Sequence, residues 1–230
     1  MIYVVSDIHG CYEKFQKMLE LIKFNDKDTL YILGDVIDRG KNGIKILTDT
    51  MKRSNVVFIM GNHEYMALKC LPFLLDDPQN AKIQDMEYDD IRNLQLWIAN
   101  RCGPTVKELA ELTKDERIAV YKFLQNAKYY EKVNAGGNSF ILSHGVIDNY
   151  ELINPLEEYD PESFLYGRPS ENPINSGDKL FVFGHTPVQF LNDDNKILYR
   201  DNLIDIDCGC VFDGGQLACL CLDTLEEFYI

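Results

Sequence analysis

This sequence of 230 residues lacks any long apolar run. Residues 1–5 are apolar, but Ser6 and Asp7 end that run far short of a membrane-spanning helix or the core of an export signal. We therefore expect a cytoplasmic protein without a membrane partner. Internal repeats, low-complexity stretches and linkers are also lacking, so we expect a single domain over residues 1–230.

Basic residues are few compared with acidic ones. The 23 lysines and arginines stand against 37 aspartates and glutamates, which gives a net charge of −14 at pH 7. Proteins that coat nucleic acid normally present a basic face, so we expect no nucleic-acid partner. An anionic substrate is not excluded, because bound divalent ions can be the largest local charges in a pocket.

The seven cysteines do not form a regular pattern, and we expect reduced thiols. The C-x5-R sequence that a cysteine-based phosphatase needs is absent. Cys208, Cys210, Cys219 and Cys221 form one cluster. On paired strands they could build a thiolate metal site, although free cysteines of this kind are more often simply buried.

The first 60 residues alternate between patterns typical of strands and of helices. Strands are predicted at 2–6, 29–33 and 55–60, and helices at 11–24 and 43–53. This β-α-β-α-β order predicts parallel strands with right-handed crossovers.

A helical insertion is predicted at about 64–128, followed by short strands. We place these strands at 129–134, 139–143, 179–184, 196–200, 203–207, 210–213, 216–222 and 226–229. The pairs Gly136-Gly137 and Gly214-Gly215 are hairpin signals. The pattern predicts an α/β protein with two sheets and helices outside them.

All four histidines lie at predicted strand ends, beside glycine or another polar residue. The segments are 6–10 (SDIHG), 61–64 (GNHE), 143–145 (SHG) and 184–186 (GHT), with a similar fifth segment at 34–40 (GDVIDRG). Ligands of open α/β sheets bind at the carboxyl ends of strands, so we expect these five segments to converge.

Each segment taken alone has an ordinary explanation. Asp7 and His9 could be a turn aspartate and a surface histidine, segment 34–40 a solvated turn, and Asn62 a helix N-cap. Their joint occurrence in this order favours a metal site instead. Aspartate, histidine and asparagine suit manganese, iron or zinc, and there are enough of them for two ions.

The five segments resemble the signature of the phosphoprotein-phosphatase family of calcineurin-like metallophosphoesterases, which reads GDxHG, GDxxDRG, GNHE and two later histidines. The match spans residues 6–186, with Ser6 in place of the first glycine. Residues 207–217 and 96–105 resemble the bacterial and phage-lambda-type branch, except that Arg101-Cys102 replaces a double glycine. The resemblance implies the calcineurin-like α/β fold, in which two mixed β-sheets pack as a sandwich flanked by helices in four layers.

The resemblance also implies a role for each matching residue. The first metal would be held by Asp7 and His9, and the second by Asn62, His144 and His185, with Asp35 bridging both. His63 would be the general acid and Asp38 would orient it. The phosphate would be bound by Arg39, Asn62, His63 and Arg168.

We therefore expect a dinuclear-metal phosphomonoesterase with two divalent ions, manganese or else iron or zinc. A metal-bridging hydroxide would attack phosphorus directly, without a phosphoenzyme. The main interpretation is a serine/threonine protein phosphatase with phosphoprotein or phosphopeptide substrates, phosphotyrosine being left open. The alternatives are a dinucleoside-polyphosphate (Ap4A-type) hydrolase acting on a small phosphorylated metabolite, a metal-dependent nuclease, and a non-catalytic metal-binding scaffold. Segments 72–128 and 150–178 are expected to form the pocket rim.

Overall fold

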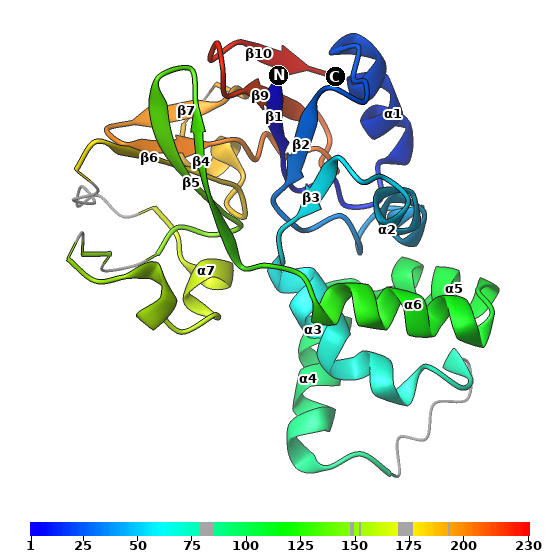
Figure 1. Ribbon diagram of the computed structural model, residues 1–230. Helices are drawn as coiled ribbons and strands as arrows, with labels where there is room; N and C mark the ends of the chain where they lie inside the picture. Colours follow the sequence, from blue (N-terminus) through cyan, green and yellow to red (C-terminus); the bar gives the residue numbers. More distant parts are fainter. Residues whose placement is uncertain (79–84, 148–149, 152, 170–176, 193) are drawn as a thin grey trace.

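The computed structural model describes residues 1–78, 85–147, 150–151, 153–169, 177–192 and 194–230 (Figure 1). One five-stranded sheet has the order β10-β9-β1-β2-β3. Its strands are β1 (Ile2–Val5), β2 (Thr29–Ile32), β3 (Val56–Phe58), β9 (Ala218–Cys221) and β10 (Glu227–Tyr229). The first three are parallel, as the crossover pattern predicts, whereas β9 runs antiparallel to both β1 and β10.

A second five-stranded sheet has the order β4-β5-β6-β8-β7. Its strands are β4 (Tyr130–Ala135), β5 (Asn138–Ser143), β6 (Lys179–Phe183), β7 (Leu198–Arg200) and β8 (Leu203–Asp205). Strands β5, β6 and β8 are parallel, and β4 and β7 run antiparallel to their neighbours. Both sheets are therefore mixed, which confirms the predicted fold class.

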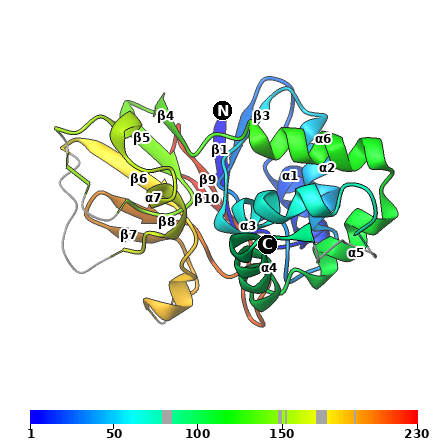
Figure 2. The same ribbon diagram turned by 90° about the horizontal axis from the view of Figure 1, so that it is seen from below.

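Apolar side chains from both sheets fill the layer between them. Val4 and Leu220 of the first sheet pack in one buried cluster with Leu142, Val182 and Ile204 of the second. A side chain of this size contributes about 1.5–3 kcal/mol when it is fully buried. Figure 2 shows the second sheet on one side of β1 and β9, and helices α1, α2, α5 and α6 on the other.

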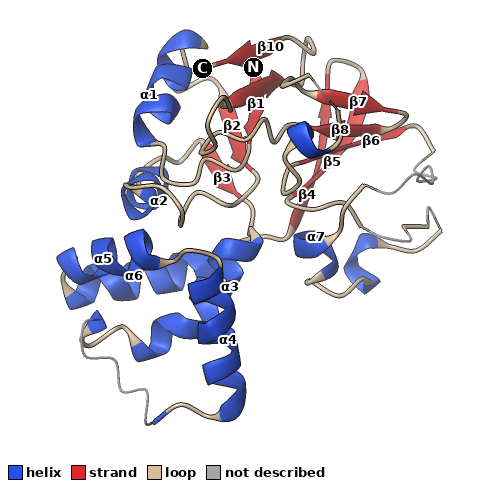
Figure 3. Cartoon of the chain, turned by 180° about the vertical axis from the view of Figure 1, so that it is seen from behind, coloured by secondary structure: helices blue, strands red, loops and turns tan. Residues whose placement is uncertain are grey.

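Two helices cover the outer face of the first sheet. They are α1 (Tyr12–Leu21) and α2 (Gly43–Met51), which lie beside that sheet in Figure 3. Phe15 and Met18 of α1 and Leu47 of α2 pack in one cluster with Val5 and Ile32. These positions carry the apolar spacing that predicted the helices from sequence.

The described part of the predicted insertion is largely helical and lies below both sheets in Figure 3. It contains α3 (Asn62–Cys70), η1 (Leu71–Phe73), α4 (Tyr88–Ala99), α5 (Gly103–Glu111) and α6 (Lys114–Gln125). Helix α6 starts with a capping box, in which Thr113 accepts from the amide of Glu116 and the Glu116 side chain accepts from the amide of Thr113.

Short helical turns cover the outer face of the second sheet. They are η4 (Leu156–Glu158) and α7 (Ser163–Tyr166), while η5 (Val188–Phe190) follows β6. Phe164 of α7 packs in one cluster with Phe181 and Tyr150, and it stacks on Tyr130 with a centroid distance of 4.8 Å. No helix among the described residues is long and apolar enough to cross a membrane.

The strand predicted at 210–213 is wrong, because this segment forms consecutive turns. Gly209 and Gly214 have φ values of +68° and +76°, and the Phe212 amide donates to the Gly209 carbonyl at 2.9 Å. The glycines bend the backbone where a strand would need extended residues. The hairpin at Gly214-Gly215 is therefore not formed, whereas the one at Gly136-Gly137 joins β4 to β5 and is confirmed.

The thiolate metal site considered for the cysteine cluster is also wrong. Cys208 packs in the layer between the sheets, whereas Cys210, Cys219 and Cys221 pack in the cluster on the helix side of the first sheet. All four are free and buried. They act as small apolar side chains, which was the other interpretation.

Candidate metal centre

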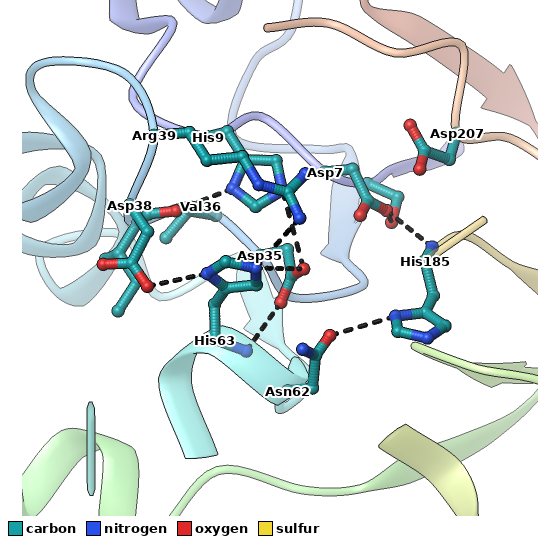
Figure 4. A network of polar contacts seen from close by, with 12 residues as sticks. Asp7, His9, Asp35, Val36, Asp38, Arg39, Asn62, His63, His185 and Asp207 are labelled. Atoms are coloured by element: carbon teal, nitrogen blue, oxygen red, sulfur yellow. Dashed lines mark hydrogen bonds and ion pairs between the residues drawn. The ribbon is translucent and has the colours of Figure 1, made fainter. Parts of the chain in front are cut away.

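The five polar segments meet at the seam between the two sheets. Figure 4 labels residues of four of them, and His144 of the fifth contacts Asn62 and lies 3.5 Å from Asp35. The first sheet supplies residues at the ends of its three parallel strands, namely Asp7 and His9 after β1, Asp35 after β2 and Asn62 after β3. The second sheet supplies His144 after β5 and His185 after β6. A centre built in this way depends on both sheets keeping their relative position.

Asp35 lies in the middle of this centre. His9 Nε2 lies 3.6 Å from its Oδ2, and His144 Nε2 lies 3.5 Å from its Oδ1. The amide of His63 donates to Oδ1 at 3.0 Å, which fixes the carboxylate. Burial favours the neutral acid, but the neighbouring His144, His63 and His9 outweigh it and lower the pKa of Asp35. The position is that of a bridging ligand.

A ring nitrogen of His144 and the side-chain oxygen of Asn62 lie close together, in an arrangement that suits a bound cation. The Nδ1 of His144 donates to the Leu33 carbonyl at 2.7 Å, so in the neutral ring Nε2 carries a lone pair. This Nε2 lies 2.9 Å from Asn62 Oδ1, and His185 Nδ1 lies 3.0 Å from the same oxygen. An amide oxygen and two ring nitrogens that converge at these distances form a donor set that suits a divalent ion.

His9 shows a similar arrangement. Its Nδ1 donates to the Ile37 carbonyl at 2.8 Å, while its Nε2 is buried without a hydrogen-bond partner. A buried orphan nitrogen is unfavourable unless it binds something. Burial also lowers the pKa of His9, which keeps the ring in the neutral form that a metal needs. The donor set therefore fits divalent metal ions.

Asp7 and His185 connect the two sheets directly. The amide of His185 donates to Asp7 Oδ2 at 3.0 Å, and Ser6 Oγ donates to the same oxygen. Burial raises the pKa of Asp7. Burial, followed by the charge of His144, lowers the pKa of His185 to about 3. A side chain at Gly184 would collide with Ser6 and Asp7, because a Cβ there would lie 2.1 Å from Ser6 Oγ.

His63 is placed differently from the other histidines. Its Nδ1 lies 2.6 Å from Asp38 Oδ2, and Arg39 Nη2 donates to its Nε2 at 3.1 Å. Burial lowers the pKa of His63, but the Asp35 carboxylate and the hydrogen bond to Asp38 outweigh burial, so the net shift is upward. Ring nitrogens of His63 and His9 lie within 4.8 Å of each other and of an Asp35 oxygen, but Nε2 of His63 also accepts a hydrogen bond from Arg39.

Sequence reasoning gave no role to the residues that hold Asp38. Trp97 Nε1 donates to Asp38 Oδ2 at 2.8 Å, and Thr105 Oγ1 donates to Oδ1 at 2.6 Å. The amide of Asp38 in turn donates to Thr105 Oγ1 at 2.9 Å. The sequence signal for Trp97 and Thr105 was the resemblance of segment 96–105 to the bacterial and phage-lambda-type branch. Spacing alone does not predict contacts between residues that are 59 and 67 positions apart.

Glu64 is a further residue to which the sequence assigned no role. Its carboxylate accepts from the amides of Asp35, Val36 and Ile37 at 2.7, 2.8 and 3.1 Å. Burial and the charge of Asp35 raise the pKa of Glu64 to about 7. Glu64 therefore fixes the loop that presents Asp35.

The loops that carry the polar segments of the centre have a strained backbone. Positive φ values occur at six residues of the centre: Asp7, His9, Asp35, Asp38, Arg39 and His185. The loops also come very close, since a Cβ on Gly34 would lie 2.3 Å from the amide nitrogen of Gly61. Such strain is characteristic of functional sites.

Arg168 is exposed just beyond α7. Its charge helps to lower the pKa of His185, after burial and His144, so it lies within electrostatic range of the centre. The structure gives it no hydrogen bond or ion pair to another described residue. A phosphate role for Arg168 stays a prediction.

A groove of about 700 Å³ lies between α3, α4 and α7. It is lined by Tyr65, Met66, Lys69, Asp89, Arg92, Asn93, Leu96, Glu162 and Tyr166. The Tyr65 hydroxyl donates to Glu162 at 2.7 Å, and the Tyr166 ring lies 6.4 Å from that of His185. Residues of both predicted rim segments line the groove, together with part of α3, and its Tyr166 wall lies beside His185.

Comparisons with known proteins show which family and which relatives the chain resembles. A family model described as calcineurin-like phosphoesterase matches residues 1–223. The asymmetrical bis(5'-nucleosyl)-tetraphosphatase PrpE of Anoxybacillus flavithermus is 28% identical over 98% of this chain and 92% of its own length. Serine/threonine-protein phosphatase 1 of Salmonella typhimurium is 29% identical over 94% of this chain and 89% of its own.

Other matches are shorter or show the fold alone. A symmetrical bis(5'-nucleosyl)-tetraphosphatase of Wigglesworthia glossinidia brevipalpis is 35% identical over 42% of this chain, and the chain spans only 36% of that relative. The crystal structure of a cold-active protein-tyrosine phosphatase of a psychrophilic Shewanella species has a TM-score of 0.57. It is 17% identical and covers 99% of this chain and 76% of its own.

Proposed function

Because the chain belongs to the calcineurin-like phosphoesterase family of dinuclear-metal hydrolases, we propose that it removes phosphate from phosphoserine and phosphothreonine in cytoplasmic proteins. The observation that carries the phosphatase chemistry is the meeting of ligand-type side chains from both sheets around Asp35. Phosphotyrosine is a secondary substrate in this proposal.

We assign the residues of the centre to two ions that share Asp35. Asp7 and His9 complete one site, and Asn62, His144 and His185 complete the other. Manganese is the proposed metal, and iron or zinc suits the same donors. When bound, the ions would neutralise phosphate charge and lower the pKa of a water nucleophile.

The remaining residues bind phosphate and move the proton. Arg39 is a forked donor suited to phosphate oxygens, and it lies on the Nε2 side of His63. A phosphate that engages Arg39 frees Nε2, from which His63 can protonate the leaving oxygen. No cysteine, serine or other side chain is assigned as nucleophile, so the proposal has no phosphoenzyme.

The charges in the groove favour a peptide substrate. Lys69 and Arg92 stand against Asp89 and Glu162, so the lining has mixed sign. A phosphopeptide can pair with both signs, whereas the two cations and two carboxylates together give a polyphosphate chain no net attraction. This supports the protein phosphatase proposal over hydrolysis of a polyanion.

A second candidate is a dinucleoside-polyphosphate hydrolase. The PrpE relative of Anoxybacillus flavithermus matches over 92% of its length, and its identity of 28% is close to the 29% of the Salmonella typhimurium phosphatase. Parallel assays with manganese on a phosphothreonine peptide and on diadenosine tetraphosphate separate the candidates. We expect the higher kcat/KM on the phosphopeptide. A tenfold preference for diadenosine tetraphosphate would replace the first candidate with the second.

A further inference from the structure

The consecutive turns of residues 209–215 have no role in the mechanism above. They stand where a strand was predicted at 210–213, and they carry Phe212. The guanidinium carbon of Arg39 lies over the ring of Phe212, 5.6 Å from the ring centroid. A cation within about 6 Å of an aromatic centroid is attracted by the face of the ring. Segment 209–215 therefore contacts the arginine that we assign to phosphate binding.

Backbone and lysine contacts hold segment 209–215 in place. The amide of Phe212 donates to the Gly209 carbonyl, and the amide of Gly215 donates to the Phe212 carbonyl, both at 2.9 Å. From α1, Lys14 Nζ donates to the carbonyls of Cys210 at 2.8 Å and Gly215 at 3.0 Å. A Cβ on Gly215 would lie 1.8 Å from the Gly209 carbonyl oxygen, so only glycine allows this approach. The Phe212 ring is thus carried by a segment that is anchored to α1.

The guanidinium of Arg39 keeps donors free for a phosphate. Among the described residues it makes one hydrogen bond, from Nη2 to Nε2 of His63 at 3.1 Å (Figure 4). An arginine side chain has five N–H donors. In the proposed mechanism a phosphate draws Arg39 away from His63, and Phe212 is then the side chain that still holds the guanidinium. An arginine that is already ordered loses less conformational entropy when it binds a ligand.

We propose that Phe212 is a positioning residue, whose ring orders the guanidinium of Arg39 for the phosphate group of the substrate. The inference rests on the proposed phosphate-binding role of Arg39. Because Phe212 acts on phosphate through Arg39, loss of the ring should weaken the binding of a phosphate ester and of free phosphate alike. An interaction that binds substrate and transition state equally changes KM and leaves kcat unchanged.

A purely structural role for Phe212 makes a different prediction. If the ring served only to stabilise segment 209–215, its loss would have the same effect whether or not Arg39 was present. The fold should tolerate the loss of the ring, because Phe212 is 38% exposed and backbone hydrogen bonds close the turns. Phe212→Leu is therefore a usable variant.

The test compares Phe212→Leu with the wild-type chain in saturating manganese. The KM for p-nitrophenyl phosphate and the Ki for inorganic phosphate should both rise by about 3–30-fold, the range expected for a cation–π contact. The kcat should stay within about twofold of the wild-type value. Phe212→Tyr keeps the aromatic ring and should restore both constants. Phe190→Leu is the matched control, since it makes the same change at an exposed phenylalanine on η5.

A second comparison uses Arg39→Ala as the background. Adding Phe212→Leu to Arg39→Ala should leave KM and Ki unchanged, because the ring then has no guanidinium to hold. An equal rise with and without Arg39 would overturn the inference, as would unchanged constants in Phe212→Leu or a failure of Phe212→Tyr to restore them. These results would leave the proposed function intact. Wild-type protein that releases no phosphate from any phosphate ester would overturn the proposed function, and this inference with it.

Discussion

His63 has different partners at its two ring nitrogens. Nδ1 donates to Asp38, while Nε2 accepts from Arg39. A ring held in this way has no proton on the nitrogen that faces the centre. Phosphate that draws Arg39 away removes this donor, and the raised pKa of His63 then favours protonation at Nε2. In the proposed mechanism, Arg39 would therefore link the binding of phosphate to the protonation of His63.

Substitution of His63 by asparagine should lower kcat by about 10²–10⁴-fold, the usual contribution of a positioned acid. Metal content, measured by mass spectrometry, should stay at the wild-type level, because His63 is not assigned as a ligand. p-Nitrophenyl phosphate is the control substrate. Its leaving group needs little protonation, so kcat on this substrate should fall less. An unchanged kcat on a phosphoserine peptide would remove His63 from the mechanism.

Substitution of Asp38 by asparagine should move the alkaline limb of the kcat profile to lower pH. The carboxylate raises the pKa of His63, so its removal lowers that pKa. The acid works in its protonated form, and activity is lost as pH rises through the pKa. The measurement is kcat against pH in saturating manganese. A limb that stays in place or moves to higher pH would contradict the assignment.

At the scale of elements, helices α4 and α5 of the predicted insertion hold Asp38, the carboxylate that contacts His63. Helix α4 supplies Trp97 and α5 supplies Thr105, and both side chains are buried against Asp38. Both helices therefore reach His63, the proposed proton donor, through the Asp38 carboxylate. Changes in their packing should alter kcat even where no groove residue changes.

Trp97→Phe keeps most of the ring but removes the hydrogen bond to Asp38. A hydrogen bond to a charged group is worth about 1.5–3 kcal/mol, so we expect kcat to fall by about tenfold or more with little change in KM. Ile98→Ala is the control, because Ile98 is exposed on the same helix and does not line the groove. Equal kcat values for Trp97→Phe and the wild type would contradict this role.

Lys69 and Arg92 should determine which phosphopeptides bind well. Replacing either by alanine removes a positive charge from the groove, so KM for a peptide with acidic flanking residues should rise several-fold. The kcat/KM for p-nitrophenyl phosphate, which does not reach the groove, should not change. Lys122→Ala on α6 is the matched control. An equal fall in kcat/KM on both substrates would indicate that Lys69 and Arg92 contribute to stability instead.

At the scale of the whole molecule, the centre joins the two sheets. Its proposed ligands come from β1, β2 and β3 on one side and from β5 and β6 on the other. Ions held there stabilise the native arrangement only, because the unfolded chain does not assemble the donors.

Removal of metal should therefore lower the Tm as well as abolish activity. At a free Mn²⁺ concentration of 100 times Kd, binding adds about 2.7 kcal/mol to the free energy of unfolding. For a chain of this size, that corresponds to about 5–10 °C in Tm. Calorimetry in EDTA and then in excess manganese measures the difference, and Asn62→Ala should reduce it. An identical Tm in both conditions would argue against a metal centre at the seam.

The sequence predicted those parts of the fold and site that depend on local pattern. The parallel strands and the loops with Asp7, Asp35 and Asn62 were predictable, because each lies where an apolar run ends in glycine and polar residues. The prediction of a strand at 210–213 was wrong because glycines bend that segment. The support of Asp38 by Trp97 joins residues 59 positions apart, and such a contact depends on helix packing.

The pairing of β9 with β1 has a consequence for biosynthesis. Val5 lies opposite Cys219, and Tyr3 lies opposite Cys221. One edge of β1 therefore stays unpaired until β9 has been synthesised. While the ribosome is still making the residues before 218, a nascent chain carries an apolar strand with an open edge. Such edges invite pairing with other chains, and folding at high rates of expression should depend on chaperones that cover them.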